Sequence, residues 1–236
     1  SNTIQFNAMQ GIQLSSSGKT LAEVSDILFT FNNVSCNGED GIQVTANSGM
    51  SSIVSDINFT SNTILNNGKQ GIELTSGVNG GPYGDFLYNI TFSSNNISRN
   101  EGSGVHLNAA QHEESTVFDA VFDNNTFVSN SQEAILIEGG IISNITGNTI
   151  KQSVYGIFYK GTQNNVSEFN NISSNDFGMF VSDGATVQAQ NNYWGDPTGP
   201  YHLTINPQGK GNTVNGNGDD LRFTPFLLLL QEVNGK

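Results

Sequence analysis

Short segments in which apolar and polar residues alternate recur along the whole chain, separated by Asn and Gly. Typical segments contain the pairs Ile12/Leu14, Ile57/Phe59 and Ile90/Phe92. Alternation with a period of two indicates β-strands that bury one face, and the intervals between turn residues leave no room for a helix of ordinary length. The pattern therefore predicts an all-β protein built from many short strands.

Two landmarks repeat in a constant order. The first is an Asn followed two residues later by an apolar residue, and it occurs at Asn2, Asn32, Asn62, Asn95, Asn125, Asn148, Asn170 and Asn192. The second is a small residue followed by an apolar one, and it comes eight or nine residues after each of the first seven Asn, at Gly11, Gly41, Gly71, Gly104, Ala134, Gly156 and Gly178. Both landmarks keep phase over seven repeats, so the chain is a tandem array.

The length of the repeat indicates what it builds. A unit of 22 to 33 residues with three short strands cannot bury its apolar face alone, whereas stacked units can. We therefore expect a single-stranded, right-handed parallel β-helix of about eight coils over residues 1–195, with residues 196–236 as a C-terminal covering segment of the same domain. Equivalent side chains would then form columns at intervals of about 4.8 Å, with Asn amides hydrogen-bonded at a turn and Ile and Val filling the interior.

The composition disfavours several classes of partner and location. The formal net charge is −13 with only eight Lys and Arg, which disfavours nucleic acid and anionic membrane surfaces. The longest apolar run is Phe226–Leu230, far shorter than the roughly 18 residues of a membrane span. Cys36 is the only cysteine, so no intrachain disulfide can form. No signal peptide is visible, as in a cytosolic protein or a mature exported one.

The repeats, together with "NNYWGDPTGPYH" (191–202) and "FTPFL" (223–227), are similar to those of a known group. They resemble the pectate-lyase-like right-handed β-helix superfamily, especially the NosD-like carbohydrate-binding and sugar-hydrolysis repeats of exported surface proteins. The resemblance implies an extracellular or cell-surface location. It also implies either a non-catalytic scaffold or a polysaccharide lyase, hydrolase or epimerase, because one fold carries many activities. Enzymes of this kind use calcium with an Arg or Lys base, or closely placed Asp residues, and no such spacing is evident here.

The intervals between landmarks change along the chain. From the small residue to the next Asn there are 21, 21, 24 and 21 residues in the first four coils and 14 in each of the last three. We expect the extra residues to form loops at one corner of the first four coils, within 15–25, 45–55, 75–88 and 108–118. Binding residues concentrate on loops held by a rigid scaffold, so this corner is where the enzyme hypothesis places its chemistry.

One strand column combines polar and aromatic side chains. Strand alternation places Gln13, Gln43, Glu73, His106, Leu136, Phe158 and Phe180 on an outward row. Amides and carboxylates beside aromatic rings suit a sugar chain, so Gln43, Glu73, His106, Phe158, Phe180 and the loop residue Tyr83 are the candidate carbohydrate-binding residues. Glu73 and His106 are also a candidate acid/base pair. The alternative is a solvated ion pair beside an apolar patch covered by the tail.

A further column lies six positions before the Asn column and contains the acidic residues Asp26, Asp56 and Asp119, with Asn89 at the equivalent position of the third coil. Like charges about 4.8 Å apart need relief from water, backbone N–H groups or bound Ca²⁺. Asp and Asn commonly cap turns, so we expect a turn role, with Asp26, Asp56 and Asp119 as the candidate metal ligands if the role is different.

Eight Asn-x-Ser/Thr sequons occur. This is close to the number expected by chance in a chain of 236 residues with 33 Asn and 43 Ser or Thr. Strand alternation turns Asn58 and Asn144 outward, which makes them the candidate glycosylation sites.

The two ends suggest self-association. Asn2 and Ile4 already occupy landmark positions, and an uncovered coil templates association. The tail is rich in apolar residues, including Phe223 and Phe226. We expect a head-to-tail contact that grows into a filament or sheath, the alternative being that a preceding segment covers the first coil.

Overall fold

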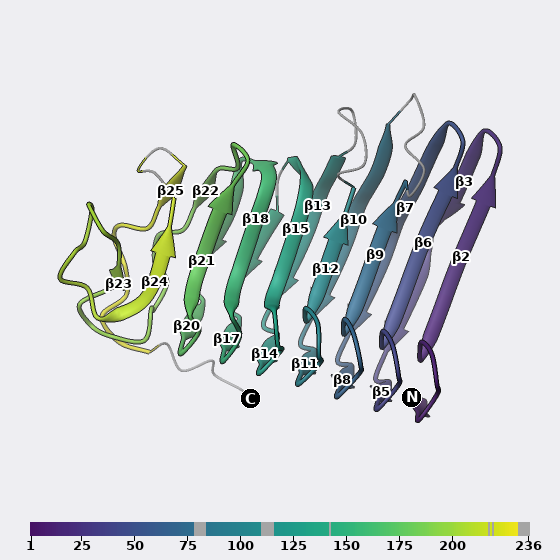
Figure 1. Cartoon of the computed structure of the whole chain (residues 1–236), viewed down its shortest axis with the longest axis horizontal. Coiled ribbons are helices and arrows are strands. Elements are labelled where there is room, and N and C mark those ends of the chain that lie inside the picture. The colour runs from purple at the N-terminus through teal and green to yellow at the C-terminus, as the bar shows by residue number, and fades with distance from the viewer. Residues whose placement is uncertain (78–83, 110–115, 142, 217, 219, 231–236) are drawn as a thin grey trace.

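The computed structural model describes residues 1–77, 84–109, 116–141, 143–216, 218 and 220–230. The chain winds as a solenoid whose coils follow one another along the long axis of the molecule (Figure 1). Each coil contributes strands to three sheets, and the strands pair in parallel with the equivalent strands of the neighbouring coils. The predicted all-β parallel β-helix is therefore confirmed.

Sheet 1 carries the shortest strands. Its order is β1 (Thr3–Gln5), β5 (Asn33–Ser35), β8 (Thr63–Leu65), β11 (Asn96–Ser98), β14 (Thr126–Val128), β17 (Thr149–Lys151) and β20 (Asn171–Ser173). Each strand begins one residue after a landmark Asn.

Sheet 2 forms a second wall. Its order is β25 (Leu221–Arg222), β22 (Val187–Gln188), β19 (Asn165–Glu168), β16 (Ser143–Thr146), β13 (Thr116–Asp123), β10 (Asp85–Ser93), β7 (Ser51–Thr60) and β3 (Leu21–Val24), with β4 (Ile27–Thr30) also paired to β7.

Sheet 3 carries the outward row singled out above. Its order is β2 (Ile12–Gly18), β6 (Ile42–Ser48), β9 (Ile72–Ser76), β12 (Val105–Asn108), β15 (Glu133–Ile141), β18 (Tyr155–Gln163), β21 (Phe177–Ser182), β24 (Gly211–Asn215) and β23 (Pro200–Tyr201).

The interior is filled by columns of like side chains. Phe29, Phe59, Phe92 and Phe122 stack through four coils with ring centroids 4.8, 4.9 and 4.5 Å apart and nearly parallel rings. Apolar residues of sheets 1 and 3, such as Ile64 and Ile72, are fully buried beside them. Stacking of the coils removes these apolar faces from water, and each Å² of apolar surface buried contributes about 25 cal/mol. Burial along the whole interior therefore stabilises the solenoid.

The landmark Asn residues form the predicted hydrogen-bonded ladder. In a typical step, Asn62 donates from its backbone N and its Nδ2 to Asn95 Oδ1, at 2.8 and 3.0 Å, and Nδ2 also donates to Phe29 O at 2.8 Å. The residue before the Asn has a left-handed backbone, as at Ser61 with φ 55°. Each amide thus satisfies backbone groups that the corner would otherwise leave unpaired.

A second Asn ladder lies five residues further along each of the early coils. Asn37 Nδ2 donates to Asn67 Oδ1 at 2.9 Å, Asn67 to Asn100 at 2.9 Å, and Asn100 to Asn130 at 3.0 Å. These residues were not singled out from the sequence, although their spacing repeats as regularly as that of the first ladder. The corner between sheets 1 and 3 is therefore fixed in the same way as the corner between sheets 2 and 1.

The expectation of loops in the first two coils is wrong. The extra residues lengthen strands instead: Ser15–Gly18 pair with Thr45–Ser48, and Leu21–Val24 pair with Ser51–Val54. Equal insertion length in adjacent coils lets the added backbone groups pair with each other, so the chain extends the sheets rather than leaving them. Residues 78–83 and 110–115, in the next two coils, lie outside the described residues.

The C-terminal covering segment continues the solenoid. Its strands β24 and β25 pair in parallel with β21 and β22, the last strands of the repeats. Trp194, Leu221 and Phe223 are buried at this end of the core. In contrast, Leu228, Leu229 and Leu230 are exposed, so only part of the apolar tail packs on the core.

Candidate functional site

The outward face of sheet 3 carries three parallel rows of side chains. The middle row is the one expected from the sequence, and each member faces its neighbour in strict register from Gln13 to Phe180. A row on one side includes Glu133, Tyr155 and Phe177, and a row on the other includes Glu138, Lys160 and Ser182. Residues from seven coils therefore meet on one continuous face.

The first half of this face is a chain of hydrogen bonds between polar side chains. Gln13 Nε2 donates to Gln43 Oε1 at 2.9 Å. Gln43 Nε2 in turn donates to Glu73 Oε2 at 3.0 Å and to Asp40 Oδ2 at 3.2 Å. The Gln43 amide thus stands between two carboxyl groups and fixes the position of both.

His106 continues the chain and bridges two carboxylates. Its Nε2 lies 3.0 Å from Glu138 Oε2, and its Nδ1 lies 3.9 Å from Glu73 Oε1. Lys160 Nζ donates to the other Glu138 oxygen at 2.7 Å. The side chains of His106, Glu73 and Glu138 are only 12%, 20% and 16% exposed, so this network sits in the surface rather than above it. The predicted juxtaposition of Glu73 and His106 is thus present, with Glu138 as the closer partner.

The network shifts the acidity of two carboxyl groups in opposite directions. Hydrogen bonds from His106, and to a smaller extent from Lys160, lower the pKa of Glu138 to about 2. Burial, reinforced by the nearby charge of Glu73, raises the pKa of Asp40 to about 6. Asp40 is only 1% exposed and also accepts from the Gln70 backbone N at 3.0 Å. It holds the polar row in place and is not open to a ligand.

The second half of the face is an aromatic cluster, which we call the aromatic ledge: Tyr155, Phe158, Phe177 and Phe180. Ring centroids lie 5.4 Å apart for Tyr155 and Phe177, 5.1 Å for Phe158 and Phe180, and 5.6 Å for Phe177 and Phe180. All four side chains are partly exposed. Edge-to-face and stacked contacts between the rings keep the ledge rigid.

Half of the ledge could be expected from the sequence and half was missed. Phe158 and Phe180 were candidates, and both lie on the face where the sequence placed them. Tyr155 and Phe177 were overlooked because they precede the small landmark residues Gly156 and Gly178. The position before the landmark is partly exposed at Tyr155 and Phe177, and the same repeat alignment contains both aromatic residues at that position. Tyr83, the remaining carbohydrate-binding candidate, lies outside the described residues.

The column six positions before the landmark Asn residues occupies a corner within or beside sheet 2. Asp26, Asp56, Asn89 and Asp119 all have left-handed backbone, with φ of 58°, 55°, 52° and 54°. Asn and Asp tolerate this conformation better than most residues, which gives the column a backbone role. In the described part of the chain, no group of three or more His, Cys, Asp and Glu side chains is arranged to hold a metal ion.

The candidate glycosylation sites Asn58 and Asn144 are both exposed on sheet 2. Two other sequon residues, Asn165 and Asn171, are buried. Within the described residues, no helix has the length and apolar character needed to cross a membrane.

Comparison with known proteins identifies the repeat. A family profile described as a right-handed β-helix region matches residues 83–221, more than half of the chain. No curated protein and no solved structure matches the chain significantly.

Proposed function

Because the chain belongs to the right-handed β-helix family, we propose that it is an extracellular or cell-surface scaffold whose sheet 3 face binds carbohydrate. The observation that carries the proposal is the continuation of the hydrogen-bonded polar row, through Leu136, into the aromatic ledge. Sugar rings lie on aromatic faces while their hydroxyls bond to amides and carboxylates, and this face offers both along one line.

The face also has the rigidity that such binding needs. Its rows are fixed by parallel pairing in every coil and by side-chain hydrogen bonds between coils. Equivalent residues recur at about 4.8 Å, so an extended glycan lying along the solenoid axis could contact successive coils. Binding then orders few protein side chains, which limits the entropy lost on association.

A polysaccharide lyase, hydrolase or epimerase is the second candidate function. His106 between Glu73 and Glu138 is the observation that favours it, since a His held by carboxylates can act as an acid or base. Two features weigh against it. Glu138 is already hydrogen-bonded to His106 and Lys160, and Glu73 is already hydrogen-bonded to the Gln43 amide.

Self-assembly into a filament or sheath would suit a scaffold. Leu203, Leu228 and Leu229 of the covering segment are 74%, 61% and 75% exposed and offer an apolar surface at one end of the solenoid. Electron microscopy and light scattering at high concentration would reveal head-to-tail growth, whereas a strictly monomeric particle would argue against it.

A glycan array tests the main proposal, with neutral, amino-bearing and uronate polysaccharides. We expect retention of at least one glycan class and weaker retention by the His106→Ala variant. A variant at an exposed polar residue of another sheet, Asn58→Ala, serves as the control. A blank array, or an unchanged profile for His106→Ala, would count against this site. Incubation of each retained glycan with the protein, followed by chromatography, tests the enzyme hypothesis through the appearance of shorter chains.

A further inference from the structure

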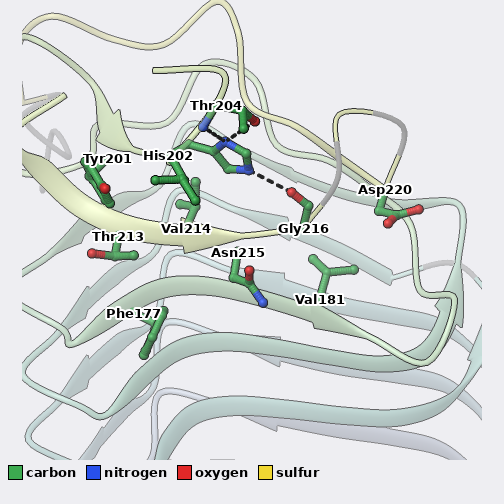
Figure 2. A pocket seen from close by; sticks show the side chains of 11 residues that line it. Phe177, Val181, Tyr201, His202, Thr204, Thr213, Val214, Asn215, Gly216 and Asp220 are labelled. Atoms are coloured by element: carbon green, nitrogen blue, oxygen red, sulfur yellow. Dashed lines mark hydrogen bonds between the residues drawn. The ribbon is translucent and has the colours of Figure 1, made fainter. Parts of the chain in front are cut away.

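A pocket of about 400 Å³ lies where the covering segment meets the end of sheet 3. Phe177 of the aromatic ledge is one of its lining residues, so ledge and pocket are continuous. The outward row continues from Phe177 to Thr213 on β24 and from Thr213 to Tyr201 on β23. Figure 2 shows these three side chains following one another across neighbouring strands. A ligand that lies along the ledge would therefore reach the pocket.

The wall of the pocket is preformed by His202. Its Nδ1 accepts hydrogen bonds from the backbone N of Ile205 at 3.1 Å and of Thr204 at 3.3 Å, so the proton resides on Nε2, which donates to Gly216 O at 2.7 Å (Figure 2). The imidazole is buried and lies 5.7 Å from the ring of Phe223. His202 thus ties the turn of the covering segment to β24 and has no ring nitrogen left for a ligand.

The remaining lining suits an uncharged sugar. Tyr201 is 37% exposed and offers an aromatic face, and Leu203 forms an exposed apolar rim. Thr213 and Asn215 supply a hydroxyl and an amide from β24. Asp220 adds a carboxyl group, which would repel an anionic sugar, and Lys and Arg are absent from the described lining residues. The volume falls at the lower end of the range of about 300–1,000 Å³ that small-molecule sites span, enough for one terminal sugar unit.

The position of the pocket limits how a glycan can lie. β23 is the last strand in the order of sheet 3, and the turn that follows it, held by His202, lines the pocket. A polymer that follows the ledge toward this end meets the covering segment and cannot continue along the sheet. Building on the carbohydrate-binding function proposed above, we propose that this pocket holds the terminal monosaccharide of a neutral glycan, so that the protein recognises a chain end.

Binding stoichiometry tests this proposal. The wild-type protein is titrated with short and long chains of the same linkage, namely cello-, malto- and laminari-oligosaccharides and manno-oligosaccharides with their long-chain counterparts. End recognition predicts one protein molecule per chain at both lengths. We also expect Tyr201→Ala and Asn215→Ala each to weaken binding of both lengths, the tyrosine variant by roughly tenfold. Tyr88→Ala, which removes a partly exposed ring that stacks on Phe118 over sheet 2, is the matched control. Thermal melting of each variant verifies its fold.

The possible failures are distinguishable. If the number of protein molecules per chain rises with chain length, or if Tyr201→Ala and Asn215→Ala bind as the wild type does, the glycan is held along its interior. The end-recognition proposal is then wrong while the carbohydrate-binding function stands. If the wild-type protein binds none of these neutral glycans at either length, both the end-recognition proposal and the proposed function in its neutral-glycan form are overturned.

Discussion

His106 Nε2 lies 3.0 Å from Glu138 Oε2, and Lys160 Nζ lies 2.7 Å from the other oxygen of the same carboxylate. The three residues come from β12, β15 and β18, which are neighbouring strands in sheet 3. The network therefore links the polar half of the sheet 3 face to its aromatic half. The carboxylate accepts hydrogen bonds from both partners, so its ionised form is part of the folded structure.

This network should make the protein lose stability in acid. The pKa of Glu138 is lowered to about 2 from 4.5, so its stabilising contribution is fully present above pH 4.5 and is lost as the pH falls toward 2. Glu138→Gln should lower the free energy of unfolding at pH 7 by roughly 1–2 kcal/mol, since hydrogen bonds to a charged group are worth about 1.5–3 kcal/mol. Urea denaturation from pH 2 to 7 should show a smaller difference between variant and wild type at pH 2. A constant difference across this range would contradict the assignment.

Asp40 should have the opposite effect on stability. The pKa of Asp40 is raised from 3.8 to about 6 by burial and by the charge of Glu73, so its contribution is most favourable below pH 3.8 and is lost as the pH rises through 6. Asp40→Asn should therefore be more stable than the wild type at pH 7, on the order of 1–3 kcal/mol, and gain nothing at pH 3.5. Thermal melting at both pH values measures this, with the exposed Glu23→Gln as control. A variant that is less stable at pH 7 would refute the burial argument.

Each Asn of the ladder should contribute several hydrogen bonds to the stability of the folded protein. Asn125 is 1% exposed, and its amide donates to Phe92 O at 2.9 Å and to Asn148 Oδ1 at 3.0 Å. It also accepts from Asn95, so Asn125→Ala leaves buried donors and acceptors on both neighbouring coils unpaired. We expect a loss of roughly 2–4 kcal/mol in the free energy of unfolding by urea, against less than about 0.5 kcal/mol for Asn58→Ala. Equal effects of the two substitutions would be inconsistent with a structural ladder.

Acidic polysaccharides should bind poorly to this face. Glu73 and Glu138 lie on it, with the buried carboxyl groups of Asp40 and Glu133 beside them, against the single cation Lys160 among these described residues, and the whole chain carries a net charge of −13. A uronate chain would bring carboxylates toward carboxylates, which costs affinity, particularly at low salt. Retention of a uronate polymer at low ionic strength should therefore be at least roughly tenfold weaker than retention of the preferred neutral glycan. Stronger binding of the uronate polymer would exclude a neutral ligand class.

The sequence predicted the parts of the fold that depend on periodicity. The landmark Asn residues, the two interior columns that contain Ile64 and Ile72, and the outward row from Gln13 to Phe180 all lie where a repeat alignment places them. In a parallel solenoid the register between coils is fixed by equal spacing of landmarks, so a column in the alignment becomes a column in space.

Three features could not be predicted from the repeat alignment, each for a physical reason. The bond between His106 and Glu138 crosses from one outward row to the next, and only side-chain rotamers decide that the imidazole reaches Glu138 at 3.0 Å and Glu73 at 3.9 Å. The extended strands of the first two coils replace expected loops, since insertions of equal length can pair with each other. The pocket beside Tyr201 depends on how residues after the repeats fold back.

Carbohydrate binding at the sheet 3 face is tested most directly by the affinity of the Phe158→Ala/Phe180→Ala variant for the best neutral glycan of the array. These partly exposed rings lie 5.1 Å apart in the middle row of the sheet 3 face and are not part of the buried core. We expect calorimetric titration to show an affinity reduced by at least roughly tenfold, while Tyr88→Ala retains wild-type affinity. Wild-type affinity in the double variant would contradict carbohydrate binding at the sheet 3 face.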